Sequence, residues 1–100
     1  MGFDKRYTID SRKVAYRVIG GEAVILNLDN GYYYSLNEVG TRVWEAIEDN
    51  RSVDAILDLL EKEYGMPKKQ LRDDIIVLLQ HLEKEELVEE ASPGRRGQKK

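Results

Sequence analysis

The alternation of apolar and polar residues predicts three short strands in the first third of the chain. Apolar side chains recur at every second position over residues 14–18, which is the period of a strand with one buried face. Gly20-Gly21 then predicts a turn, and the nearly continuous apolar run over residues 23–28 predicts a central strand. Tyr32, Tyr33 and Tyr34 suit a third strand, because aromatic side chains pack well on a pleated surface. The pattern predicts a three-stranded antiparallel meander with the tyrosine strand at one edge.

Turn geometry and side-chain alternation together predict the two faces of this sheet. Asn30-Gly31 allows positive φ at both central positions of a two-residue hairpin turn, and Gly20-Gly21 is read as the second turn. With two-residue turns, cross-strand partners share a face, and we expect one face to pack on helices. That face would carry Val14, Tyr16, Val18, Ala23, Ile25, Tyr34 and Leu36, and the opposite, also apolar, face would carry Val24, Leu26, Leu28 and Tyr33.

Capping signals predict that a helix follows the tyrosine strand directly. Ser35 and Glu38 have the spacing of a capping box, in which the hydroxyl and the carboxylate each bind a backbone N–H at the helix start. Tyr34 and Val39 then occupy the positions of a hydrophobic staple. Gly40 lowers helix propensity, so we expect another element to pack closely against its backbone.

Two further helices are predicted from breakers and apolar spacing. Ser52 is a suitable N-cap for the second helix, which Gly65 ends, and Pro67 suits the first turn of a third helix over about residues 68–86. The predicted fold class is therefore α+β, a winged-helix-like arrangement of a three-stranded antiparallel sheet followed by three helices. The expected core positions of the helices are Val39, Val43, Trp44, Ile47, Val53, Ile56, Leu57, Leu60, Tyr64, Leu71, Ile75, Leu78 and Leu82.

Length and composition limit the chain to one small domain. Its 100 residues are 41% hydrophobic, which fits a single modest core. We expect residues 1–12 to be an N-terminal arm, either loose or ordered in part as a short extra strand, residues 13–90 to be the domain, and residues 91–100 to be a disordered basic tail. The absence of cysteine excludes disulfides and thiolate metal sites. Without a signal peptide or an apolar run of about 20 residues, a cytoplasmic location is expected.

Motifs and residue types argue against catalysis. The single histidine, His81, is expected on the flank of the third helix as a structural side chain. No phosphate-binding loop or Gly-x-Ser-x-Gly motif is present. Asp73-Asp74 and Glu85-Glu86 are adjacent in a helix and point in different directions, so we expect them to form solvated faces rather than a shared metal site. We expect no enzyme activity, no cofactor and no metal site.

A second apolar pair on the third helix, Ile76 and Leu79, has two interpretations. The pair lies roughly 100° around the helix from the core positions, with Arg72 and Glu83 flanking it. In the first interpretation, the sheet of the same chain covers the pair. In the second, the pair forms one wall of a groove whose other wall is the tyrosine strand.

The charge distribution argues against a nucleic-acid-binding winged helix, which is the alternative function for this arrangement. The whole chain has a net charge of −3, but its first 91 residues carry 12 basic and 19 acidic groups, because four cations lie in the tail. Over residues 68–86 the third helix counts four basic and five acidic residues. Because phosphate neutralisation supplies most duplex affinity, DNA binding is disfavoured.

Several residues resemble a known family. The resemblance covers about residues 13–90 and rests on the string Leu28-Asp29-x-Gly31-x-Tyr33-Tyr34-x-Leu36-Asn37-x-x-Gly40-x-x-Val43-Trp44, then Ser52-Val53 and a leucine-rich helix ending in Tyr64. This string resembles the PqqD-like family, small chaperones also known as RiPP recognition elements. The chain is most similar to the stand-alone form that accompanies the leader peptidase of lasso-peptide pathways, and forms serving radical-SAM enzymes are nearly as similar.

The resemblance implies a non-catalytic adaptor that binds the leader segment of a ribosomally made precursor peptide and presents it to a leader peptidase or a radical-SAM modifying enzyme. The leader would add as a strand between the third strand and the third helix, which is β-augmentation. The protein is expected to be a monomer or an edge-strand dimer, and a dimer through residues 32–35 would compete for the same surface. A separate hypothesis is a structural subunit that packs permanently on a larger enzyme. Neither nucleic acid nor membrane is expected as a partner. The expected peptide-binding residues are Tyr32, Tyr33, Tyr34, Ser35, Arg72, Ile76, Val77, Leu79 and Glu83, with Tyr34 the one we expect to pack structurally.

Overall fold

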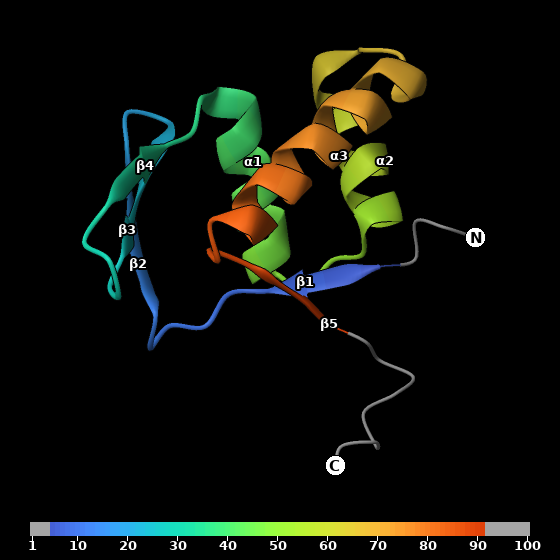
Figure 1. Cartoon of the computed structure of the whole chain (residues 1–100). Helices are drawn as coiled ribbons and strands as arrows, with labels where there is room; N and C mark the ends of the chain where they lie inside the picture. Colours follow the sequence, from blue (N-terminus) through green and yellow to red (C-terminus); the bar gives the residue numbers. More distant parts are fainter. Residues whose placement is uncertain (1–4, 92–100) are drawn as a thin grey trace.

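The computed structural model of the chain describes residues 5–91 and places a sheet at one end of the molecule with three helices beside it (Figure 1). A second, two-stranded sheet lies below the helices in this view. The elements in chain order are β1 (Arg6–Thr8), β2 (Val14–Ile19), β3 (Glu22–Asn27), β4 (Tyr33–Ser35), α1 (Glu38–Glu48), α2 (Val53–Tyr64), α3 (Lys68–Lys84) and β5 (Glu89–Ala91).

The three-stranded sheet confirms the predicted meander and its two faces. Its strand order is β2-β3-β4, with antiparallel pairing throughout. Ile25 lies opposite Tyr16 on one side and Tyr34 on the other, so these three residues share the face that packs on the helices. Gly20 and Gly21 both have positive φ, at 61° and 83°, and form the two-residue turn between β2 and β3.

The predicted two-residue turn at Asn30-Gly31 is wrong. Asn27 pairs with Tyr32 through a 2.9 Å backbone hydrogen bond, which leaves a four-residue loop between β3 and β4. Of the two predicted turn residues, only Gly31 has a positive φ. The Asn27 side chain accepts the Asp29 N–H at 2.8 Å. The register therefore differs by two residues from the predicted one. Because side chains alternate with a period of two, this shift leaves the strand residues on their predicted faces, whereas Leu28 lies in the loop and not in the sheet.

The start of α1 differs from the predicted capping box. The N-cap is Asn37, whose Oδ1 accepts the Gly40 N–H at 2.8 Å, whereas Ser35 belongs to β4. The staple predicted for Tyr34 and Val39 is wrong for the same reason, because the cap lies two residues later. Gly40 is indeed in close contact, but with the residues just before its own helix: a Cβ there would meet Leu36 Cβ at 3.3 Å.

The other helix boundaries follow the sequence signals. Ser52 Oγ accepts the Ala55 N–H, and Gly65 ends α2 in the left-handed conformation. Helix α3 ends at Lys84, two residues before the predicted limit, because Glu86 has a φ of 63° and the Leu87 N–H turns back to the Leu82 carbonyl. The helices enclose a core whose largest fully buried side chains include Trp44, Ile56, Leu57, Leu60, Leu71, Ile75 and Leu82.

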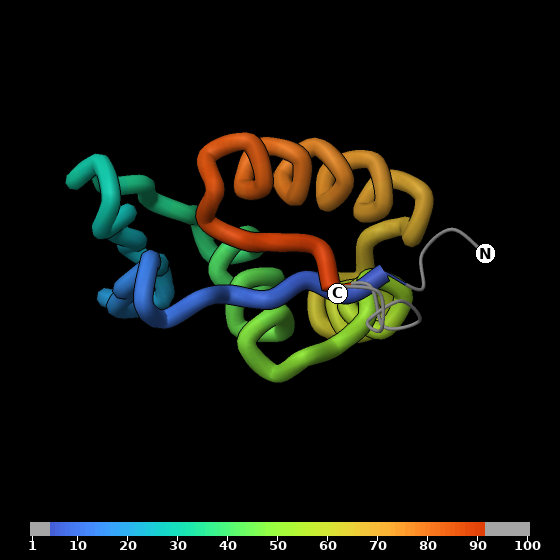
Figure 2. Tube along the Cα trace, turned by 60° about the horizontal axis from the view of Figure 1, so that its bottom comes forward, coloured from blue at the N-terminus to red at the C-terminus, as the bar shows by residue number. Residues whose placement is uncertain are grey.

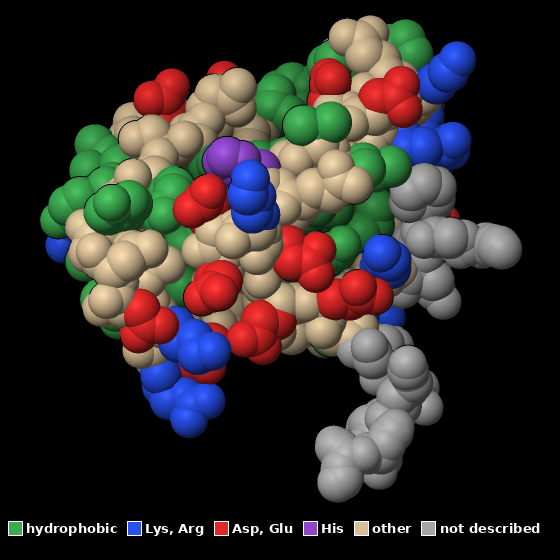
Figure 3. All heavy atoms as spheres, in the orientation of Figure 1, with side chains coloured by type: hydrophobic (Ala, Val, Ile, Leu, Met, Phe, Trp, Pro, Cys, Tyr) green, Lys and Arg blue, Asp and Glu red, His purple; other side chains and the backbone are tan. Residues whose placement is uncertain are grey.

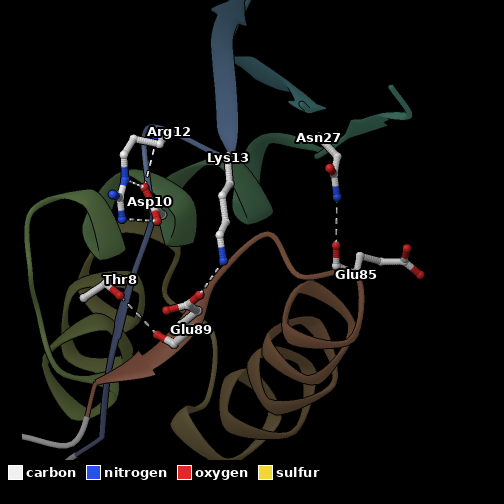
Figure 4. A network of polar contacts seen from close by, with 7 residues as sticks. All are labelled: Thr8, Asp10, Arg12, Lys13, Asn27, Glu85 and Glu89. Atoms are coloured by element: carbon white, nitrogen blue, oxygen red, sulfur yellow. Dashed lines mark hydrogen bonds and ion pairs between the residues drawn. The ribbon is translucent and has the colours of Figure 1, made fainter. Parts of the chain in front are cut away.

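A two-stranded antiparallel sheet joins the two ends of the described chain. Arg6 lies opposite Ala91, and Tyr7 is buried as part of the core. Figure 2 shows this pair crossing the helical end of the molecule. Lys13 binds Glu89 at 3.4 Å and Thr8 donates to the Glu89 carbonyl, which links β5 to the start of β2 and to β1 (Figure 4). The strand in the N-terminal arm was one of two predicted states, whereas β5 was not predicted. Apart from Ala91, the predicted tail lies outside the described residues, as do residues 1–4.

Thr41 connects α1 to the sheet. Beyond Ser35 the chain leaves the sheet, so the backbone N–H of Ala23 loses its strand partner and instead donates to Thr41 Oγ1 at 2.8 Å. Thr41 Oγ1 in turn donates to the Leu36 carbonyl at 3.3 Å. Ala23 is fully buried, so without Thr41 its N–H would have no access to water.

Thr41→Val is expected to lower the free energy of unfolding by about 1–3 kcal/mol. Valine keeps the shape of threonine but leaves the buried Ala23 N–H without an acceptor, and that desolvation cost is not recovered. Urea unfolding followed by circular dichroism measures the change. Thr8→Val is the matched control, because the exposed Thr8 hydroxyl makes only a 3.5 Å contact. Equal unfolding midpoints for the two variants would show that the Thr41 hydroxyl is dispensable.

Candidate functional site

Strand β4 presents an open edge. It lies at the outer position of the sheet, next to β3 on one side only within the described part of the chain. The Asn27 N–H donates to the Tyr32 carbonyl, and the Leu36 N–H donates to the Ala23 carbonyl, each at 2.9 Å. Backbone groups alternate between the two sides of an antiparallel strand, so even-numbered residues here face β3. The residues that turn their N–H and C=O groups away from β3 are Tyr33 and Ser35.

A groove runs beside this edge, between the end of β4 and helix α3. Its volume is about 470 Å³, and most of its lining is apolar. In Figure 3 the single histidine lies on this face, with hydrophobic side chains on both sides of it. The groove has three sides, which are formed by Ser35, Leu36 and Asn37, by Val39, Gly40 and Val43 of α1, and by Met66, Leu71, Asp74, Ile75, Leu78 and His81.

Hydrogen bonds from the sheet to Glu85 hold the end of α3 next to β3 and β4. The Tyr34 hydroxyl donates to Glu85 Oε1 at 2.9 Å. The Asn27 amide donates to the Glu85 carbonyl at 3.3 Å (Figure 4). Partial burial, followed by the hydrogen bond to Glu85, raises the pKa of Tyr34, so its hydroxyl stays a donor at neutral pH. Because Glu85 directly follows α3, these contacts position the groove wall relative to the edge strand.

Of the three consecutive tyrosines, two are exposed and one packs against the core. Tyr32 and Tyr33 are 66% and 71% exposed, whereas Tyr34 is half-buried against the core and bonded to Glu85. Tyr34 therefore has the structural position that we expected for it. Ser35 lies at the end of the open edge and lines the groove.

The predicted wall on α3 lies on the other side of the helix. Ile76, Leu79 and Glu83 line a separate depression with Tyr7 of β1 and Val53 of α2. Leu79 is only 3% exposed and belongs to the core. Arg72 and Ile76 are half-buried, and Val77 is 65% exposed. The structure thus does not bring these α3 residues to the β4 edge. Ile76 and Leu79 face β1 and α2 across this depression rather than the three-stranded sheet.

The residues that do face the groove from α3 were assigned to other roles from the sequence. Leu78 was predicted as a core residue, Asp74 as part of a solvated face and His81 as a structural side chain. All three lie on one flank, because positions i, i+4 and i+7 share a helix face. The spacing of Asp74, Leu78 and His81 was visible in the sequence, but no sequence signal showed which flank of α3 faces β4.

Neither a metal centre nor a membrane span is found in the described residues. No group of three or more histidine, aspartate or glutamate side chains within residues 5–91 is arranged to hold a metal ion. No helix in the same range has the length and hydropathy that a bilayer span requires.

The fold and the groove define a small winged-helix-like α+β domain, and comparison with known proteins identifies its family. The chain belongs to the PqqD family, described as coenzyme PQQ synthesis protein D, which matches residues 22–88. It is also similar to a solved structure described as TbiB1 in complex with the TbiA(beta) leader peptide. That likeness has a TM-score of 0.76 at 30% sequence identity, and covers 81% of this chain and 93% of the other. No curated protein sequence matches the chain.

Proposed function

We propose that this protein is an adaptor that binds the leader segment of a ribosomally made precursor peptide as an added strand on β4. The observation that carries the proposal is the open edge of β4 beside an apolar groove. The similarity to TbiB1, whose structure contains a leader peptide, supports it. Presentation of the bound peptide to a leader peptidase or a radical-SAM enzyme is the expected purpose of such binding.

The chemistry of the site suits an extended peptide. The N–H and C=O groups of Tyr33 and Ser35 would pair with the peptide backbone, which gives affinity for many sequences. Side chains of an added strand point alternately to the two faces of the sheet, so every second one would enter the groove. Leu78 and Val39 offer apolar contact there, while Asp74 at the rim favours a cationic peptide residue.

The charge around the site opposes the nucleic-acid alternative. Asp74 lines the groove itself, and Glu85 and Glu86 directly follow α3 at its end nearest the sheet. Negative charge at these positions repels a phosphate backbone. A peptide partner requires no such neutralisation.

A titration of the isotopically labelled protein with a leader peptide, followed by NMR, tests the proposal. We expect the amide shift changes to gather on β4 and on the α3 flank that contains Asp74, Leu78 and His81. Trp44 fluorescence is a poor reporter, because Trp44 is fully buried and its ring contacts Tyr16 on β2 instead of the groove. Shift changes confined to the depression beside Ile76 and Glu83, or none at saturating peptide, would contradict the proposed site.

A further inference from the structure

The opposite edge of the sheet, strand β2, is also open. In the described chain, β2 pairs only with β3. The Leu28 N–H donates to the Lys13 carbonyl at 2.8 Å, so odd-numbered residues of this strand direct their backbone groups toward β3. The six-residue strand contains no proline and no bulge, which are common protections of an edge. The residues that turn their N–H and C=O groups outward are Val14, Tyr16 and Val18.

The side chains of β2 are apolar except for Arg17, and Tyr16 and Val18 are incompletely covered. Tyr16 and Val18 lie on the face that packs on the helices, yet they are 38% and 39% exposed. The Tyr16 ring contacts Trp44 of α1 edge to face, with 5.4 Å between centroids. The other flank of Tyr16 has no neighbouring strand in the described structure. An apolar backbone edge of this kind suits another strand.

We propose that a second copy of this chain pairs with β2, so that two antiparallel β2 strands join two sheets into one of six strands. The two-fold axis passes beside Tyr16, which pairs with Tyr16 of the second copy. Val14 then lies opposite Val18 of the second copy, and Val18 opposite its Val14. All three residues turn their backbone groups outward, so each of these pairs can exchange two hydrogen bonds. The edge is therefore complementary to itself in this register.

In this register the like charges of the two copies are diagonal neighbours rather than directly opposed. On the outer face, Arg17 lies opposite Ala15 of the second copy, and Lys13 lies opposite Ile19. No two like charges are directly opposed, although β2 and its preceding residue carry only positive charges.

The helices leave room for this pairing. Helix α1 packs mainly on β3, and its Trp44 also reaches Tyr16 of β2. In the joined sheet, β3 and its copy are three strand spacings apart, which is about 14 Å. Packed helices need only about 8–10 Å between their axes, so the two α1 helices fit, with Tyr16 and Val18 between them. Both β4 edges stay free at the two ends of the joined sheet.

Sedimentation equilibrium of the full chain tests the pairing through charge. We expect a reversible species of twice the 11.6 kDa chain mass at high protein concentration. Ala15→Arg should weaken dimerisation about tenfold or more, because symmetry places two new arginine pairs directly opposite each other. The double change Ala15→Arg with Arg17→Glu should restore it. Both positions are exposed, so thermal unfolding should show that each variant remains folded.

Cysteine pairing tests the register, because the chain has no cysteine of its own. Mixing an Ala15→Cys chain with an Arg17→Cys chain under mild oxidation should give a covalent dimer, since directly opposed residues have Cα atoms about 4.5 Å apart. Either variant alone should give little, because identical positions lie two residues out of register.

Three results would overturn the proposal. They are a monomer at every concentration, a dimer that Ala15→Arg leaves unchanged, and equal cross-linking in the mixed and single samples. Addition of leader peptide distinguishes a dimer through β2 from a dimer through β4. A β2 dimer should persist, whereas a β4 dimer should dissociate because the peptide occupies the same edge.

Discussion

The Leu78→Asp variant is expected to bind a leader peptide at least about thirtyfold more weakly than the parent chain. Leu78 lines the groove from α3 and is half-buried there. Loss of an apolar contact of this size costs about 2 kcal/mol, and the new carboxylate adds a charge next to Asp74 in an apolar groove. Isothermal titration calorimetry with the same peptide measures the change in dissociation constant.

Val77→Asp is the matched control for this experiment. Val77 neighbours Leu78 in sequence, is 65% exposed and does not line the groove. Its replacement should change the affinity less than about twofold, as for most exposed positions away from a binding site. A similar loss of affinity in both variants would mean that negative charge anywhere on α3, rather than the groove wall, controls binding. Leu79→Asp is unsuitable, because Leu79 is a core residue and its replacement would unfold the protein.

The Tyr33→Pro variant is expected to lose at least about tenfold in peptide affinity while its fold persists. The Tyr33 N–H points away from β3, so proline removes a hydrogen bond to the guest strand and places its ring in that strand's path. A native-like circular dichroism spectrum together with weakened binding is the expected result. Tyr33 is 71% exposed, so little core packing is lost.

Tyr34→Pro is the internal comparison, because it tests the same chemistry one residue further along. The Tyr34 N–H faces β3, and its ring packs against the core. Proline here should lower the free energy of unfolding by about 1–3 kcal/mol through loss of a ladder hydrogen bond. If Tyr33→Pro unfolds the protein and Tyr34→Pro does not, the assignment of the two sides of β4 is reversed.

The two faces of the sheet were predicted correctly although the length of the β3–β4 loop was not. The observed loop differs from the predicted one by an even number of residues, so the alternation of side chains is unchanged. Asn30-Gly31 resembles a two-residue turn, but the Asn27 side chain holds a four-residue loop instead. Two extra residues preserve the alternation, so Ile25 and Tyr34 still share the buried face. A loop longer by one residue would have moved every side chain of β4 to the opposite face of the sheet.

The groove wall was mispredicted because periodicity defines the stripes on a helix but not the neighbour of each stripe. Ile76 and Leu79 do form a second apolar stripe, and it borders a depression that Tyr7 of β1 and Val53 of α2 also line. Strand β1 has three residues, pairs with a strand 81 positions away at Thr8 and Glu89, and shows no clear alternation. A contact of that range leaves no local signal in the sequence. Without knowledge of the β1 contact, sequence periodicity does not show which flank of α3 faces β4.

The β1–β5 pair has a consequence for the architecture of larger proteins. Because Arg6 faces Ala91, the two ends of the described unit are about 5 Å apart, a gap that a few glycines can bridge. The backbone is thus nearly a closed ring. A circular permutant opened at Gly20-Gly21 should keep its β4 edge, and the unit as a whole can be inserted into a surface loop of an enzyme without stretching either connection.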